Sequence, residues 1–187
     1  MAPLRTFIVH VEDLPGVLNR VTSLIRRRDY NIASLTVGQT HTPGISRMTI
    51  VMEANDDAAS RIMANLYKLV NVIHVEDTTH QATVTRELAL IKVRADTTTR
   101  AKVIELCELF RARVIDVSPS ALICEITGTA DKLEGLVEVL TPFGIVEMVR
   151  TGRIAMARGS GALEKGASPR TQATPATSPH DVSSGSV

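Results

Sequence analysis

The sequence predicts an α+β protein made of two similar halves, followed by a tail without regular structure. Stretches in which apolar and polar residues alternate indicate strands, and stretches with apolar residues every three or four positions indicate helices. The order strand, helix, strand, strand, helix, strand occurs once before residue 80 and again after it. The end of the 187-residue chain is mostly Gly, Ser, Thr, Ala and Pro and shows neither period.

Four stretches of the first half have the pattern of strands. LRTFIVHVE, residues 4–12, alternates and is rich in β-branched and aromatic side chains, which favour strands. NIASLTVGQ (31–39) and ISRMTIVME (45–53) flank a turn at HTPG, and VIHVEDT (72–78) completes the set.

Two helices are predicted between these strands. The first has an apolar face, formed by Val17, Leu18, Val21, Leu24 and Ile25. The second has its apolar face at Ala59, Ile62, Met63, Leu66 and Val70. The basic cluster 26–28 falls at the end of the first helix, where cations complement the helix dipole, so we expect a structural role for it.

The second half repeats this order after the polar stretch THQATVT. Its predicted strands are RELALIKVRA (86–95), RVIDV (113–117), LICEITG (122–128) and GIVEMVRTG (144–152). Its two helical faces are Val103, Leu106, Cys107 and Phe110, and then Leu133, Leu136, Val137 and Leu140. The repeated order predicts two tandem ferredoxin-like domains, each an antiparallel sheet with two helices on one face.

These patterns divide the chain into a first domain at 1–80, a second at 81–158 and a disordered tail at 159–187. The tail has too few apolar residues to offset the entropy lost on ordering. Domains of about 75 residues are marginally stable alone, so we expect dimerisation or docking.

Composition excludes several classes of function. A net charge of +1 indicates no binding to nucleic acid, and three Phe and two Tyr provide no strand pair for stacking bases. No apolar run is long enough for a membrane span, and the start lacks the plan of a signal peptide, which predicts a cytoplasmic protein. Cys107 and Cys124 lack metal-site spacing and are expected to be buried packing residues.

The sequence shows no catalytic or metal-binding constellation. The five histidines are scattered, and no grouping of Ser, His and Asp is visible. His10 and His74 alternate with apolar residues on strands, so we expect them to be solvent-facing or packed side chains. We therefore predict no catalytic residues, no metal site and no cofactor on this chain.

The loop EDLPGVL, before the first helix, is the candidate binding site. Pro15 suits the first helical turn, whereas glycine within a helix costs roughly 0.5–1 kcal/mol relative to alanine. The N–H groups of Gly16, Val17 and Leu18, with the positive end of the helix dipole, would suit a carboxylate. Asp13 either caps the helix or holds an amine, and the two charges together would describe a free amino acid.

A structural explanation of the same loop stays open, in which Asp13 and Gly16 only form a tight turn into the helix. The corresponding stretch of the second half, RADTTTRAK, has Asp96 or Thr97 as an ordinary helix cap and no glycine. An amino-acid site, if present, therefore belongs to the first domain.

EDLPGVL resembles the ligand loop of ACT domains, which are ferredoxin-like modules that bind amino acids where subunits meet. RRRDYNIASLTVGQT, SRMTIVM and LYKLVNVIHV resemble more narrowly the regulatory small subunit of acetolactate synthase (acetohydroxyacid synthase). RELALIKV, FRARVIDVSPS, ITGTADKLE and VEMVRTGRIAMARG are similar to the C-terminal domain of that family. The resemblance covers about residues 3–159.

The resemblance implies a regulatory subunit that is not itself an enzyme and acts in branched-chain amino-acid biosynthesis. Its partner would be a catalytic subunit with thiamine diphosphate, Mg²⁺ and FAD, activated by the small subunit and made sensitive to feedback inhibition by valine. The alternative is an ACT-domain amino-acid sensor that regulates a different enzyme.

The resemblance also implies a site. Asp13 matches a family position that is Asn or Asp, Gly16 matches the loop glycine, and Asn31 matches an asparagine that opens the second strand. Val17, Leu18 and Ile32 match positions where the family's pocket is apolar. In a homodimer through the ACT domains, Asn31 would approach the ligand held by the other chain's loop at Gly16.

Overall fold

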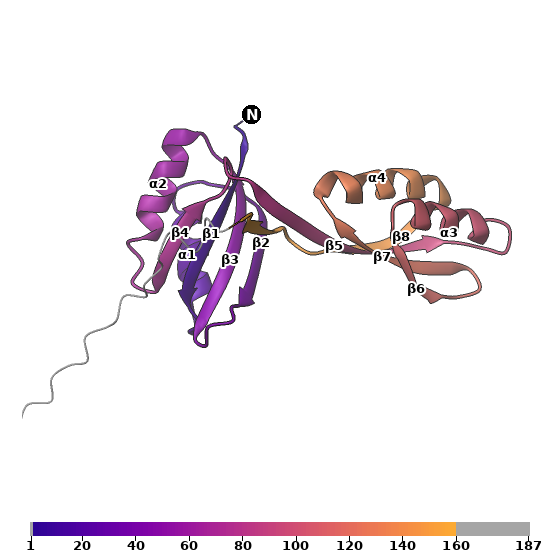
Figure 1. The fold of residues 1–187 in the computed structure, drawn as a ribbon, viewed down its shortest axis with the longest axis horizontal. Helices are drawn as coiled ribbons and strands as arrows, with labels where there is room; N and C mark the ends of the chain where they lie inside the picture. Colours follow the sequence, from indigo (N-terminus) through magenta and orange to yellow (C-terminus); the bar gives the residue numbers. More distant parts are fainter. Residues whose placement is uncertain (1, 160–187) are drawn as a thin grey trace, which may run out of the picture.

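A computed structural model describes residues 2–159 and contains two antiparallel sheets, each with two helices on one face (Figure 1). This confirms the predicted α+β fold of two ferredoxin-like units. The predicted disordered tail lies outside the described residues, apart from Gly159.

The first sheet has the strand order β2-β3-β1-β4. Its strands are β1 (Leu4–Glu12), β2 (Ile32–Gln39), β3 (Ile45–Glu53) and β4 (Val72–Asp77). The helices α1 (Val17–Arg26) and α2 (Asp56–Leu66) follow β1 and β3. The alternation on β1 explains the packing, because Phe7, Val9 and Val11 belong to the core shared with the helices.

The second sheet has the corresponding order β6-β7-β5-β8. Its strands are β5 (Thr83–Arg94), β6 (Arg113–Val117), β7 (Ala121–Gly128) and β8 (Ile145–Arg150). The helices are α3 (Arg100–Leu109) and α4 (Ala130–Leu140), with a short 3₁₀ turn at Thr141–Phe143. Cys107 and Cys124 are fully buried in this core as free thiols, as predicted.

Three elements differ from the pattern-based expectation. The strand β5 begins at Thr83, inside the polar stretch expected to connect the halves, because it pairs there with an unpredicted strand, β9 (Ile154–Ala157). Val70 lies beyond the end of α2 and is 82% exposed, so it does not belong to the apolar face of that helix. Phe110 is the C-terminal cap of α3 and packs against the second core.

The strand β9 returns to the first sheet, although it follows the second half in sequence (Figure 1). It lies on the face opposite α1 and α2, where Arg47 of β3 donates a hydrogen bond to the carbonyl of Ala155 at 2.6 Å. Ile8 and Val51 point to this face and are only 2% exposed. Both faces of the first sheet are therefore covered.

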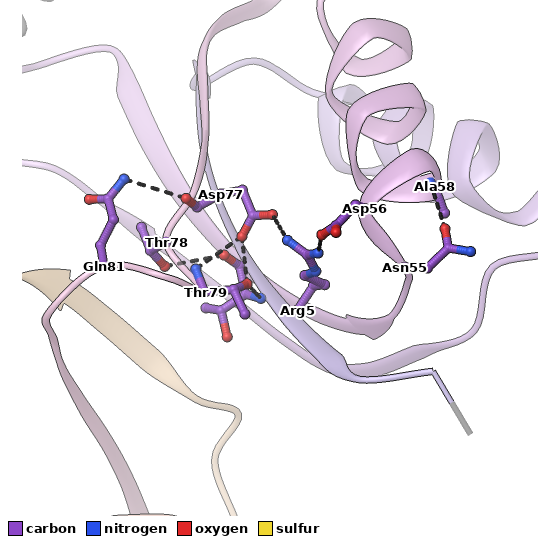
Figure 2. Close-up of polar contacts among 9 residues, drawn as sticks. Arg5, Asn55, Asp56, Ala58, Asp77, Thr78, Thr79 and Gln81 are labelled. Carbon is purple, nitrogen blue, oxygen red and sulfur yellow. Dashed lines mark hydrogen bonds and ion pairs between the residues drawn. The ribbon is translucent and has the colours of Figure 1, made fainter.

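An ion cluster around the buried side chain of Arg5 holds the end of the first sheet together (Figure 2). The guanidinium of Arg5 lies 2.9 Å from the carboxylate of Asp77 and also contacts Asp56 at the start of α2. The side chains of Arg5 and Asp77 are 6% and 12% exposed, whereas that of Asp56 is 88% exposed. Asp77 also accepts a hydrogen bond from the amide of Thr79, so the cluster orders the chain where β4 ends.

Candidate functional site

The helix α1 begins one residue after Gly16, which is its N-terminal cap residue. Gly16 has φ +84°, a left-handed conformation that glycine adopts without strain. Pro15 therefore lies in the turn before the helix, and the expectation that it occupies the first helical turn was wrong. A Cβ at this position would have nothing within 4 Å in the described chain, so close packing does not require a glycine here. The left-handed conformation of the turn is sufficient to explain it.

The amides at the start of α1 differ in their partners. The N–H of Val17 donates to the carbonyl of Leu14 at 3.3 Å. The N–H groups of Gly16 and Leu18 have no acceptor among residues 2–159. The N–H of Asn19 likewise has no acceptor there, so three donors at the positive end of the helix dipole are open to an external anion in the described chain.

The side chain of Asp13 does not cap this helix, so the expected capping role was wrong. The alternative role, holding an amine, stays a prediction. Its carboxylate accepts a hydrogen bond from Nε2 of Gln39, at the end of β2, at 3.0 Å. Its backbone N–H donates to the carbonyl of Gly44 in the turn between β2 and β3. Asp13 is exposed three residues before Gly16, and its carboxylate would favour a nearby ammonium group electrostatically.

The corresponding helix start of the second domain differs, because an internal carboxylate bonds to it. Asp96 precedes the cap residue Thr99 of α3 by three positions, as Asp13 precedes Gly16. Asp96 accepts hydrogen bonds from the amides of Thr98 and Thr99, both at 2.9 Å, and from both hydroxyls. These bonds hold the pKa of Asp96 well below its usual value, and the bond from the Thr98 hydroxyl has the largest effect.

The second domain thus supplies its own carboxylate to the start of its helix. Of the two predicted caps, Asp96 provides these bonds, whereas Thr97 does not and Thr99 is the cap residue. In the first domain the position of Thr98 is held by Pro15, which has no N–H to offer to Asp13. The proline therefore helps to keep the first helix start free of an internal carboxylate.

The other two candidate residues lie at the opposite end of α1. Asn31 directly precedes β2 and Ile32 begins it, and both line a hollow of about 370 Å³ together with Tyr30 and Asn19. The hollow runs along α1, because Asn19 is in the first turn of the helix, but Asn31 and Ile32 follow its last turn, and the ten residues of α1 span about 15 Å at 1.5 Å per residue. One chain therefore does not bring the six candidate residues together.

The apolar candidates also differ in their surroundings. Val17 is 4% exposed and packs in the first core, so its side chain is not available to a ligand in this chain. Leu18 is 42% exposed beside the open amides. Gln39 was missed by the sequence reasoning, because no local pattern indicates that the end of β2 reaches Asp13.

The described residues contain no group of three or more His, Cys, Asp or Glu able to hold a metal ion. His10 and His74 face each other across β1 and β4 with ring centroids 6.1 Å apart. His10 is half-buried, as expected for a packed residue. Burial lowers the pKa of His10 most, and the positive charge of Arg47 and the neighbouring His74 lower it further. Within residues 2–159, no helix is both long and apolar enough to cross a membrane.

Comparisons with known proteins agree with this architecture. A profile described as the AHAS small subunit-like ACT domain matches residues 7–74, and one described as the small subunit of acetolactate synthase matches residues 86–159. The chain is 51% identical over 157 residues to the acetolactate synthase small subunit of Mycolicibacterium smegmatis, covering 84% of this chain and 92% of that protein.

Two further relatives extend this similarity. The acetolactate synthase small subunit of Bacillus subtilis is 43% identical over 157 residues, covering 83% of this chain and 91% of that protein. The crystal structure of the small subunit from Thermotoga maritima superposes with a TM-score of 0.79 at 38% identity, covering 84% of this chain and 98% of that chain.

Proposed function

This chain belongs to the family of acetolactate synthase small subunits, and on that premise we propose that it activates the catalytic subunit and makes it sensitive to feedback inhibition by valine. As a small regulatory subunit it is not the catalytic chain. Thiamine diphosphate, Mg²⁺ and FAD would be bound by the catalytic partner.

The observation that carries the effector site is the open start of α1. The N–H groups of Gly16 and Leu18 have no acceptor in the described chain, whereas the amide of Thr99, the second-domain counterpart of Gly16, donates to Asp96. The carboxylate of an amino acid would bind these donors. Asp13 would attract its ammonium group, and Leu18 would contact its side chain.

A second copy of the chain would complete this site. The strand β2 is at the edge of the first sheet, and its outer side pairs with no other strand among residues 2–159. Pairing two β2 edges would form one continuous sheet and bury the apolar side chain of Val37, which is 42% exposed. In this homodimer, Asn31 and Ile32 of one chain would approach the Gly16 loop of the other.

Reconstitution tests the proposal. The purified chain is added to its matching catalytic subunit, and acetolactate formation is measured with and without valine, leucine and isoleucine. We expect higher activity with the chain present and inhibition by at least one of these amino acids. No effect on activity would contradict the proposal, as would turnover by the chain alone.

A further inference from the structure

Residues 34–36 of β2 contact residues 151–153, which connect β8 to β9; we call this contact the interdomain clasp. A Cβ on Gly152 would lie 2.4 Å from Oγ1 of Thr36 and 2.8 Å from both the Leu35 carbonyl and Oγ of Ser34. Cβ atoms essentially never approach other atoms within 3.0 Å. Glycine is therefore required at position 152 by close packing.

One hydrogen bond fastens the clasp, and a second lies beside it. The amide of Arg153 donates to Oγ of Ser34 at 2.8 Å, and next to the clasp Arg47 of β3 donates to the carbonyl of Ala155 in β9 at 2.6 Å. Oγ1 of Thr36 is buried in the clasp with no partner among the described residues. The contact is thus close and leaves one buried hydroxyl unpaired among the described residues, a feature that native structures rarely retain without a reason.

An ion cluster continues from the clasp into the second domain. Glu87 of β5, whose side chain is 10% exposed, accepts hydrogen bonds from Nε of Arg150 at 2.6 Å and Nε of Arg153 at 3.4 Å. Arg150 also lies 3.7 Å from Glu134 on α4. A displacement of β2 would therefore change the contacts of charged side chains on β5, β8 and α4.

The clasp is also close to the candidate effector site. Ile32 begins the same strand, and Ser34 follows two residues later, about 7 Å along a strand that rises about 3.3 Å per residue. A cavity of about 540 Å³ adjoins the clasp, lined in part by Leu4 and Val51 of the first sheet and by Ala130 of α4. An open space between the two domains therefore lies directly beside the close contact of Gly152 with β2.

We propose that the interdomain clasp transmits effector binding at the start of β2 to the second domain, with Gly152 and Ser34 as positioning residues for feedback inhibition. This inference rests on the proposed function. It adds the physical route by which a ligand on the first domain changes the second.

The Gly152→Ala variant tests the route, with Gly38→Ala as the matched control. Gly38 is also on β2, but a Cβ there has nothing within 4 Å in the described chain. We expect Gly152→Ala to bind valine within about twofold of wild type by calorimetry while its inhibition midpoint rises about tenfold, within the range of typical allosteric coupling. Gly38→Ala should retain both properties.

Ser34→Ala is the second variant, because it removes the acceptor for Arg153 without adding bulk. If a thermal melt shows that Gly152→Ala is unfolded, Ser34→Ala is used in its place. We expect Ser34→Ala to lose inhibition while it keeps valine binding and activation. Wild-type inhibition in the folded variants would overturn the inference, and so would loss of valine binding itself. If valine does not inhibit the reconstituted wild-type complex, that result would instead contradict the proposed function, and with it the role of the clasp.

Discussion

At the scale of single residues, Pro15 and Gly16 distinguish the start of α1 from the start of α3. Asp13 and Asp96 occupy equivalent positions, but only Asp96 bonds to the amides that follow it. Pro15 removes the N–H that Thr98 provides, and Gly16 adopts a φ that other residues reach only with strain. The two residues together make a helix start that is open to a ligand.

Replacing Gly16 by Asp should abolish inhibition while leaving activation. A carboxylate about 4 Å from the effector's own would raise its binding free energy by roughly 1 kcal/mol in water and roughly 4 kcal/mol at an effective dielectric of 20. Gly16→Asn is the control, because Asn tolerates the left-handed conformation similarly and carries no charge. Valine titration of the reconstituted complexes measures the difference.

If Gly16 only forms the turn, both variants will lose stability in a thermal melt and keep wild-type sensitivity to valine in the complex that remains. Inhibition of a folded Gly16→Asp complex at the wild-type midpoint would place the effector site elsewhere.

The lowered pKa of Asp96 predicts pH-dependent stability. A carboxyl group whose pKa is lowered by folding stabilises the fold above its unfolded pKa, about 3.9, and this contribution is lost as pH falls below it. Asp96→Ala should therefore lower the melting temperature at pH 7, with a difference from wild type that shrinks below about pH 4.

Asp13→Ala is the matched control, because Asp13 bonds to the exposed side chain of Gln39 and to no helix amide. It should melt close to wild type across the same pH range. Equal melting of wild type and Asp96→Ala at pH 7 would show that the Asp96 cap contributes nothing to stability.

At the scale of elements, the ends of the first sheet depend on contacts between residues far apart in sequence. Arg5 at the start of β1 joins Asp77 at the end of β4 to Asp56 at the start of α2 (Figure 2). No periodicity distinguishes this buried arginine from an exposed one, so the sequence reasoning did not predict the cluster.

Removing Arg5 should destabilise the first domain. In Arg5→Ala the nearly buried carboxylate of Asp77 loses its cation, which typically costs about 3 kcal/mol or more. Urea unfolding followed by circular dichroism measures the change. Arg61→Ala is the control, because Arg61 is an exposed residue of α2 with no ion pair among residues 2–159, and it should change the unfolding free energy by less than about 0.5 kcal/mol.

At the scale of the whole molecule, the two halves are repeats in architecture but not independent in packing. The ribbon of β5 and β9 covers the face of the first sheet that the helices leave open. The division at residue 80 remains a prediction, and the contact across it has consequences for fragments of the chain.

A fragment ending at Thr78 should still bind the effector but be less stable and more prone to associate. It lacks β9 and the other segments beyond Thr78 that lie on the face opposite α1 and α2, and therefore exposes Ile8 and Val51, whose burial contributes up to roughly 1.5–3 kcal/mol each. Thermal melting and light scattering compare it with a chain ending at Gly159, which should behave as wild type if the predicted tail plays no part. A fragment as stable as that chain would show that β9 adds nothing to the first domain.

The sequence by itself determined the order of strands and helices, because periods of two and 3.6 residues record which face of each element is buried. It also placed the candidate loop at Gly16. The tertiary structure alone decided that β9 covers the first sheet, since the short segment Ile154–Ala157 becomes a strand by pairing with Thr83–Arg86. It likewise showed that Asn31 lies at the far end of α1 from Gly16, because the ten residues of the helix stand between them.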